Sequence, residues 1–162
     1  MLDELIVANR SYSEKFSLRG LPPKASKGLA ILTCMDSRIE PLAMLGLVPG
    51  DAKILRNAGG RVTTDVLRSL VFATCFLGVT EIVVMQHTKC ALGELNDDDV
   101  KSRLVSAGLE VGEFQFMTMD NPDQALECDI ELVRSCASLP PGINVQGWRY
   151  DVDDGSVSRV IL

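Results

Sequence analysis

Two short apolar runs, each followed by residues that can bind a metal, constrain this chain more than any other feature. Residues 29–34 end in Cys34, and residues 81–86 lead in the same way to His87. Short β-branched runs closed by polar residues are typical of buried strands. If both are parallel strands of one sheet, their carboxyl ends lie at the edge where open α/β sheets bind ligands. The sequence therefore predicts a parallel sheet with a functional site at that edge.

The rest of the chain alternates predicted strands with predicted helices. Further strands are expected near 52–56 and 114–119, and helices near 39–47, from 63 or 64 to 76 or 77, after 96, and after 121. Two last strands, 143–152 and 156–162, are joined by Asp153-Asp154-Gly155, a strong hairpin signal. This order predicts an α/β fold: a mainly parallel central sheet flanked by helices on both faces, with an antiparallel C-terminal edge hairpin.

The N-terminus is predicted to form a helical arm. Residues 2–17 carry apolar side chains at helical spacing, and Gly20-Leu21-Pro22-Pro23 then ends the helix. We expect a single domain over residues 1–162, with residues 1–20 as the arm. The arm could pack on its own core or on a neighbouring subunit, and the sequence leaves both open.

Composition excludes several classes of partner. A formal charge of -6 and a pI near 4.8 argue against a nucleic-acid or anionic-membrane surface. No apolar run approaches the ~18 residues of a membrane helix, and the first residues lack a signal-peptide pattern, so we expect a soluble, cytoplasmic protein.

The five cysteines fit a reducing compartment, because their number is odd and the chain is too long to need a disulfide framework. Cys75, Cys128 and Cys136 fall within helical apolar patterns. We expect these three to be small buried hydrophobic residues. Cys34 and Cys90 differ, because each lies beside other ligand-type side chains.

Cys34, His87 and Cys90 together match a catalytic zinc site. Such a site needs three protein ligands and one open position. The His87-x-x-Cys90 spacing lets both side chains reach one ion from a turn, and Cys34 would come from the neighbouring strand end. Thiolates favour zinc over magnesium or calcium, which prefer oxygen ligands.

Asp36 and Arg38 follow Cys34 and form a candidate catalytic pair. Residues two apart in an extended segment point the same way, so the guanidinium can fork onto the carboxylate. An Arg-paired Asp36 keeps a low pKa and could accept the hydrogen bond of a zinc-bound hydroxide, which fixes the orientation of that hydroxide. Without Arg38, the same carboxylate could instead become the fourth zinc ligand and close the site.

Three consecutive acids, Asp97 to Asp99, could be mistaken for a site for a hard cation. Asn96 stands directly before them and can cap a helix. Acidic residues in a first turn also match the positive end of the helix dipole. We therefore interpret this stretch as a solvated helix start.

The combined motifs closely resemble the β-class carbonic anhydrases, in their compact prokaryotic branch. The resemblance rests on Cys34-x-Asp36-x-Arg38, His87-x-x-Cys90 and Arg56-Asn57-Ala58-Gly59-Gly60, and it extends from about residue 29 to the hairpin. It implies a zinc lyase that interconverts carbon dioxide and bicarbonate, with Zn²⁺ on Cys34, His87 and Cys90 and the Asp36–Arg38 pair as gate and orienter.

The resemblance has further implications for the pocket and the assembly. The Gly59-Gly60 loop would line the substrate pocket and supply a backbone donor. The chain would form an obligate homodimer in which the N-terminal helix embraces the partner, often paired again into a dimer of dimers.

One departure leaves the substrate open. Many longer members carry a glutamine about ten residues before the first zinc cysteine, whereas here that position is near Lys24 and no glutamine is close. A carbon disulfide or carbonyl sulfide hydrolase on the same fold is the first alternative. The second is a non-catalytic zinc-binding regulatory protein in which Asp36 caps the metal permanently.

Proton export is a further expectation. Histidine is the usual side-chain proton shuttle near neutral pH. The single histidine of this chain is a proposed ligand. Turnover should therefore depend on an external buffer.

Overall fold

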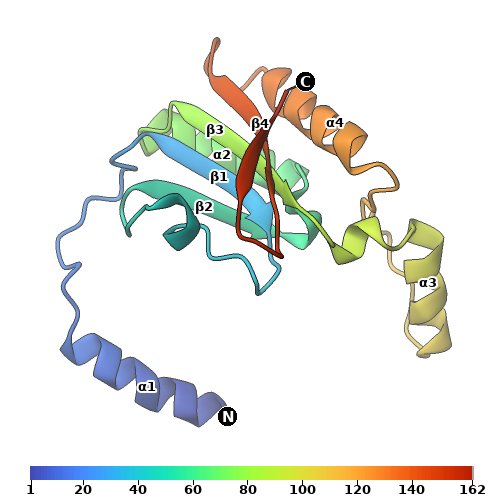
Figure 1. Ribbon diagram of the computed structural model, residues 1–162, viewed down its shortest axis with the longest axis horizontal. Helices are drawn as coiled ribbons and strands as arrows, with labels where there is room; N and C mark the ends of the chain where they lie inside the picture. The colour runs from blue at the N-terminus through green and yellow to red at the C-terminus, as the bar shows by residue number, and fades with distance from the viewer. Residues whose placement is uncertain (162) are drawn as a thin grey trace.

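A five-stranded sheet organises the protein. The computed structural model describes residues 1–161, and its strands lie in the order β2-β1-β3-β4-β5 (Figure 1). They are β1 Leu29–Cys34, β2 Ala52–Asn57, β3 Glu81–His87, β4 Asn144–Tyr150 and β5 Val157–Val160. Strands β1 to β4 pair in parallel, and β5 pairs with β4 in the antiparallel sense. The predicted α/β fold with an antiparallel edge is confirmed.

The register of β1 brings the functional strand ends together. β1 lies between β2 and β3, with Cys34 opposite Asn57 and Thr33 opposite Met85. One strand further along, His87 pairs with Tyr150. Residues that leave β1, β2 and β3 therefore emerge at the same edge, as the parallel arrangement requires.

The sheet was expected to carry helices on both faces, but both long helices that reach the core pack on one face. They are α2 Thr64–Phe76, capped by Thr63, and α4 Pro122–Arg134, capped by Asn121. Their buried side chains join one cluster with alternate residues of the strands, such as Leu32 and Val84. The opposite face, with Ile31 and Val83, is covered mainly by the 39–47 segment and by residues near the hairpin.

Two predicted elements are wrong. Residues 39–47 form only a single 3-10 turn, η1 Ala43–Leu45, which Gly46 ends in the left-handed region at φ 64°. Residues 114–119 form no strand. Met117, at φ 56°, interrupts the extended backbone, and β3 already has β1 and β4 as neighbours.

The expectation of three buried structural cysteines is also wrong. Cys75 and Cys128 are exposed, on the outer sides of α2 and α4, and Cys136 is partly buried. Both helices are apolar on more than one side, so helical spacing alone did not identify the side that meets the sheet.

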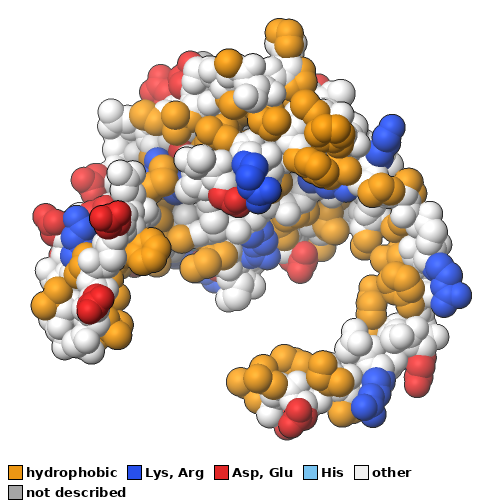
Figure 2. Space-filling view, turned by 180° about the vertical axis from the view of Figure 1, so that it is seen from behind, with side chains coloured by type: hydrophobic (Ala, Val, Ile, Leu, Met, Phe, Trp, Pro, Cys, Tyr) orange, Lys and Arg blue, Asp and Glu red, His pale blue; other side chains and the backbone are white. Residues whose placement is uncertain are grey.

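The N-terminal arm stands away from the sheet. It is the helix α1 Leu2–Glu14, in which no residue is buried, and it exposes Leu2, Leu5 and Ile6 (Figures 1 and 2). The acidic helix α3 Asp97–Ser106 also projects from the body and has no buried residue. Its capping box between Asn96 and Asp99 confirms the predicted helix start. No helix within residues 1–161 is both long and apolar enough to cross a membrane.

Candidate metal centre

Cys34, His87 and Cys90 converge as the strand pattern predicts. Cys34 ends β1, His87 ends the adjacent β3, and Cys90 follows in a turn that Lys89, at φ 53°, makes possible. All three side chains are buried, and their ligand atoms lie within 4.8 Å of one another. A single ion could therefore contact all three.

The imidazole of His87 is prepared to bind a metal through Nε2. Its Nδ1 lies 2.9 Å from the carbonyl oxygen of Thr88 and donates to it, which leaves the lone pair on Nε2. Nε2 is buried and has no hydrogen-bond partner in the described part of the chain. A buried nitrogen without a partner is costly unless something binds it.

The thiols are also suited to a metal. The Cys90 thiol donates a hydrogen bond to the Cys34 sulfur, which lowers the pKa of Cys34 to about 4 although burial opposes it. The backbone N–H groups of Asp36 and Gly59 act on the same sulfur in the same direction. A ready thiolate, a second thiol and one imidazole form a donor set that fits zinc.

Asp36 and Arg38 form the predicted pair, although they lie in a turn instead of an extended segment. Arg38 Nε donates to Asp36 Oδ1 over 2.9 Å and Arg38 Nη2 donates to Oδ2 over 2.7 Å; the backbone N–H of Arg38 also donates to Oδ1. These bonds hold the pKa of Asp36 well below its usual range. Asp36 Oδ2 lies 3.9 Å from His87 Nε2, so the pair faces the metal ligands.

Three further hydrogen bonds that the sequence did not reveal, from Arg56 and Arg38, hold this turn. Arg56, at the end of β2, donates to the carbonyl oxygens of Cys34 and Asp36 over 3.0 and 2.6 Å. Arg38 Nη2 also donates to the carbonyl oxygen of Lys89 over 3.0 Å, which joins the pair to the turn that carries Cys90. Arg56 opens the Arg56-Asn57-Ala58-Gly59-Gly60 motif, but its bonds to these two carbonyl groups could not be read from the sequence.

Gly59 and Gly60 close the site from the side of β2. They have φ values of 73° and 65°, which favour glycine, and both are buried. A Cβ on Gly60 would lie 3.0 Å from the backbone nitrogen of Cys34.

A pocket of about 370 Å³ opens beside this centre. It is lined by Cys34, the Asp36–Arg38 pair, and the apolar residues Met35, Ala58 and Leu92. Gly59 is also part of its wall, whereas Gly60 lies behind it. The pocket therefore places an apolar wall beside one ion pair and two of the candidate metal ligands, Cys34 and Cys90.

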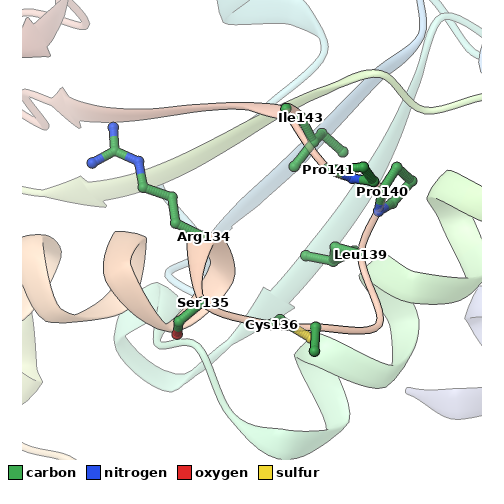
Figure 3. Close-up of a pocket in the computed structure, with 9 residues that line it drawn as sticks. Arg134, Ser135, Cys136, Leu139, Pro140, Pro141 and Ile143 are labelled. Atoms are coloured by element: carbon green, nitrogen blue, oxygen red, sulfur yellow. The ribbon is translucent and has the colours of Figure 1, made fainter.

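A larger cavity, of about 660 Å³, lies elsewhere. It is formed by the end of α4 and the loop that leads to β4, including Arg134, Cys136 and Ile143 (Figure 3). Ile143 precedes β4, whereas the candidate metal ligands Cys34 and His87 are the last residues of β1 and β3. Arg134 is bonded there to Glu131 and to the Val145 carbonyl.

Comparisons with known proteins agree with this geometry. Residues 29–112 match the carbonic anhydrase family model. A β-carbonic anhydrase of Mycobacterium tuberculosis is 41% identical over 98% of this chain and 96% of its own length. A carbon disulfide hydrolase of Saccharolobus solfataricus is 30% identical over 94% of this chain and 85% of its own length.

Solved structures give the same result. The crystal structure of a carbonic anhydrase from Streptococcus mutans superimposes with a TM-score of 0.92 at 39% identity, covering 99% of this chain and 97% of that one. Agreement in sequence, fold and ligand cluster over nearly the whole length leads to one assignment. The chain belongs to the β-class carbonic anhydrase family.

Proposed function

We propose that this protein catalyses the reversible hydration of carbon dioxide to bicarbonate. The observation that carries the proposal is the buried cluster of Cys34, His87 and Cys90 beside an Arg-held Asp36 in a largely apolar pocket. A zinc ion held by the three ligands would supply Lewis acidity and so make water a nucleophile near neutral pH.

The side chains around the ligands would orient the reaction. Asp36 stays ionised because of Arg38, so it accepts a hydrogen bond from the attacking O–H group and fixes the direction of its lone pair. Arg38 acts through Asp36. The apolar wall, with Met35 and Leu92, suits a linear and uncharged substrate.

A carbon disulfide or carbonyl sulfide hydrolase is the second candidate. The relative from Saccharolobus solfataricus carries the name carbon disulfide hydrolase, and the chain has no glutamine near Lys24 that could bond an oxygen-rich substrate. Side-by-side assays with carbon dioxide, carbonyl sulfide and carbon disulfide at matched enzyme concentration separate the two. Hydration of carbon dioxide should be fastest.

A non-catalytic zinc protein is the third candidate, in which Asp36 caps the metal. Both oxygens of Asp36 are bonded to Arg38, which favours an orienting role over a capping role. The absorption spectrum of a cobalt-substituted sample discriminates. It should respond to an inhibitory anion such as azide, whereas a permanent fourth protein ligand would leave it unchanged.

The main test is stopped-flow carbon dioxide hydration on protein of known zinc content. The wild type should contain about one zinc per chain, and Cys90→Ala should lose both the metal and at least ~100-fold in activity, since three protein ligands hold a catalytic zinc. Cys128→Ala is the matched control, because Cys128 is exposed on α4. Full hydration activity in Cys90→Ala would contradict the proposal.

We also propose that the protein works as a cytoplasmic homodimer, or as a pair of such dimers. All five cysteines are free, which suits a reducing compartment. The arm exposes Leu2, Leu5 and Ile6, and α2 exposes Phe72 and Phe76. Two unpartnered apolar surfaces on one chain favour burial against a second copy.

A further inference from the structure

A buried ion pair lies directly behind the pocket. Arg61 Nε donates to Asp129 Oδ2 over 2.6 Å, and the backbone N–H of Val62 donates to the other carboxylate oxygen over 3.2 Å. Asp129 is fully buried on α4, and Arg61 is 8% exposed. Burying such a pair is expensive, and a hydrophobic pair of the same volume would often stabilise the fold as well. Stability alone therefore gives little reason for it.

One side of Arg61 holds the glycine wall of the pocket. Its backbone N–H donates to Asn57 Oδ1 over 2.9 Å, and Asn57 Nδ2 donates to the Arg61 carbonyl over 2.7 Å. These two bonds close the loop that contains Gly59 and Gly60. Because Gly60 is pressed against the backbone of Cys34, a shift of Arg61 would move both the wall and a metal ligand.

The other side of Arg61 leads to the opposite wall. Arg61 Nη1 donates to the carbonyl oxygen of Met117 over 2.5 Å. Two residues on, the N–H of Met119 donates to the carbonyl oxygen of Leu92 over 2.8 Å. The Leu92 side chain lies 3.0 Å from where a Cβ on Gly59 would be, so the two walls touch.

We propose that Arg61 is a positioning residue that sets the spacing between the Gly59 wall and the Leu92 wall of the pocket. The inference rests on the proposed function, because it assigns Arg61 a role in that reaction. The planar guanidinium bonds the Asp129 carboxylate through Nε and the Met117 carbonyl through Nη1, a fixed two-edge geometry that the compact ammonium of lysine does not reproduce. Arg61 contacts neither substrate nor metal ligand side chains and acts through the walls.

The test compares Arg61→Lys with Arg134→Lys. Arg134 is a matched control, since it also bonds an acid of α4, Glu131, and a backbone carbonyl, that of Val145, but beside the remote cavity of Figure 3. A lysine at position 61 keeps the charge opposite Asp129 but cannot reach Asp129 and Met117 together. Three quantities are measured: zinc per chain, kcat and KM per bound zinc, and amide hydrogen exchange at residues 58–60 and 91–93.

We expect Arg61→Lys to retain zinc and to lose about 10- to 100-fold in kcat per bound zinc, because a small displacement of the pocket walls misplaces the reacting groups. Exchange in both walls should become faster, and the sulfur-to-cobalt absorption band of a cobalt-substituted sample should shift. Arg134→Lys should change none of these. Wild-type kcat per zinc together with wild-type exchange in Arg61→Lys would overturn the proposal, as would an equal loss in Arg134→Lys.

A second variant keeps the test open if Arg61→Lys does not fold. The double change Arg61→Gln with Asp129→Asn leaves neither charge buried without its partner, and the same outcomes apply to it. Exchange and the cobalt spectrum need no carbon dioxide chemistry. If the wild type does not hydrate carbon dioxide, the proposed function fails, and these two measurements still decide whether Arg61 holds the walls.

Discussion

At the scale of single residues, Asp36 holds the key position. Arg38 bonds both of its oxygens, and one of those oxygens lies 3.9 Å from His87 Nε2. The carboxylate could exchange Arg38 for a metal with a small rotation. The chemistry of the site therefore depends on how firmly Arg38 holds it.

Changing Arg38→Gln tests this dependence. The amide cannot fork onto the carboxylate, so we expect zinc to remain while kcat falls by about 10²- to 10³-fold, the usual loss when a preorganised polar group is removed. The measurement is stopped-flow hydration with zinc analysis. Arg68→Gln, which breaks the exposed Arg68–Asp65 pair on α2, should leave kcat unchanged. Unchanged activity in Arg38→Gln would show that Asp36 needs no orientation by Arg38.

The pH dependence of Asp36 follows from the direction of its pKa. The folded-state pKa is lowered by Arg38, so the stabilising contribution of Asp36 is present above its usual pKa of ~4 and is lost as the pH falls through the lowered value. Asp36 should therefore produce no change in wild-type activity between about pH 5 and 8. In Arg38→Gln its pKa returns toward ~4, so an acid limb should appear at higher pH than in the wild type. A profile of kcat against pH for both proteins checks this.

Because His87 is a candidate metal ligand, we expect turnover to need a proton acceptor from the buffer. Each cycle of carbon dioxide hydration releases a proton. The one histidine of the chain is itself part of the ligand cluster, so it is not free to carry that proton to the solvent. We expect the rate at fixed pH and ionic strength to rise with imidazole concentration and then saturate. Rates that stay flat from no added buffer to saturation would mean that another group exports the proton.

At the scale of elements, the hairpin fixes the metal-binding turn. The backbone N–H of Thr88 donates to the Tyr150 carbonyl over 3.0 Å, and the N–H of Val152 donates to Thr88 Oγ1 over 3.1 Å. Lys89 also pairs with Asp153. The last strands of the chain therefore hold the residues between His87 and Cys90, from more than 60 positions away.

The helices α3 and α4 should respond differently to loss of the same kind of cap. Asn96 and Asn121 both accept N–H groups of a first turn, but α3 has no buried residue, whereas α4 buries Leu126, Ile130 and Val133. Each Asn→Ala change should cost about 1 kcal/mol. Asn96→Ala should therefore show only as faster amide exchange within α3, and Asn121→Ala as a lower free energy of global unfolding. An equal loss of global stability in Asn96→Ala would mean that α3 is coupled to the core.

At the scale of the whole molecule, the arm shows an incomplete surface. Helix α1 buries nothing in its own chain, although Leu2, Leu5 and Ile6 form part of an apolar stripe (Figure 2). An amphipathic helix of this length gains most of its stability from packing that face. The packing partner proposed above is a second copy.

Changing Leu5→Asp together with Ile6→Asp should dissociate the proposed dimer. The wild type should sediment at a multiple of 17.6 kDa. The variant should shift toward the mass of one chain, since two apolar side chains that the proposed dimer would bury become charged. Leu132→Asp, an exposed change on α4, serves as control. A wild type that sediments as one chain would contradict the dimer.

Much of this protein follows from local sequence. The strands at Leu29–Cys34 and Glu81–His87 were predictable because short β-branched runs that end at polar residues are typical of buried strands. The ligand set followed from them, since parallel strands end at one edge. Asn96 was recognisable as a cap because a side-chain oxygen directly before an acidic first turn has a local role.

Tertiary structure decided the rest. Residues 114–119 form no strand, because Met117 at φ 56° interrupts the extended backbone, which their apolar pattern did not reveal. The exposure of Cys75 and Cys128 depended on which side of each helix met the sheet. Arg61 and Asp129 are 68 positions apart, so no local pattern could pair them. Local sequence determines where each strand ends and which side chains stand at that end. Contacts between residues distant along the chain determine what surrounds those side chains.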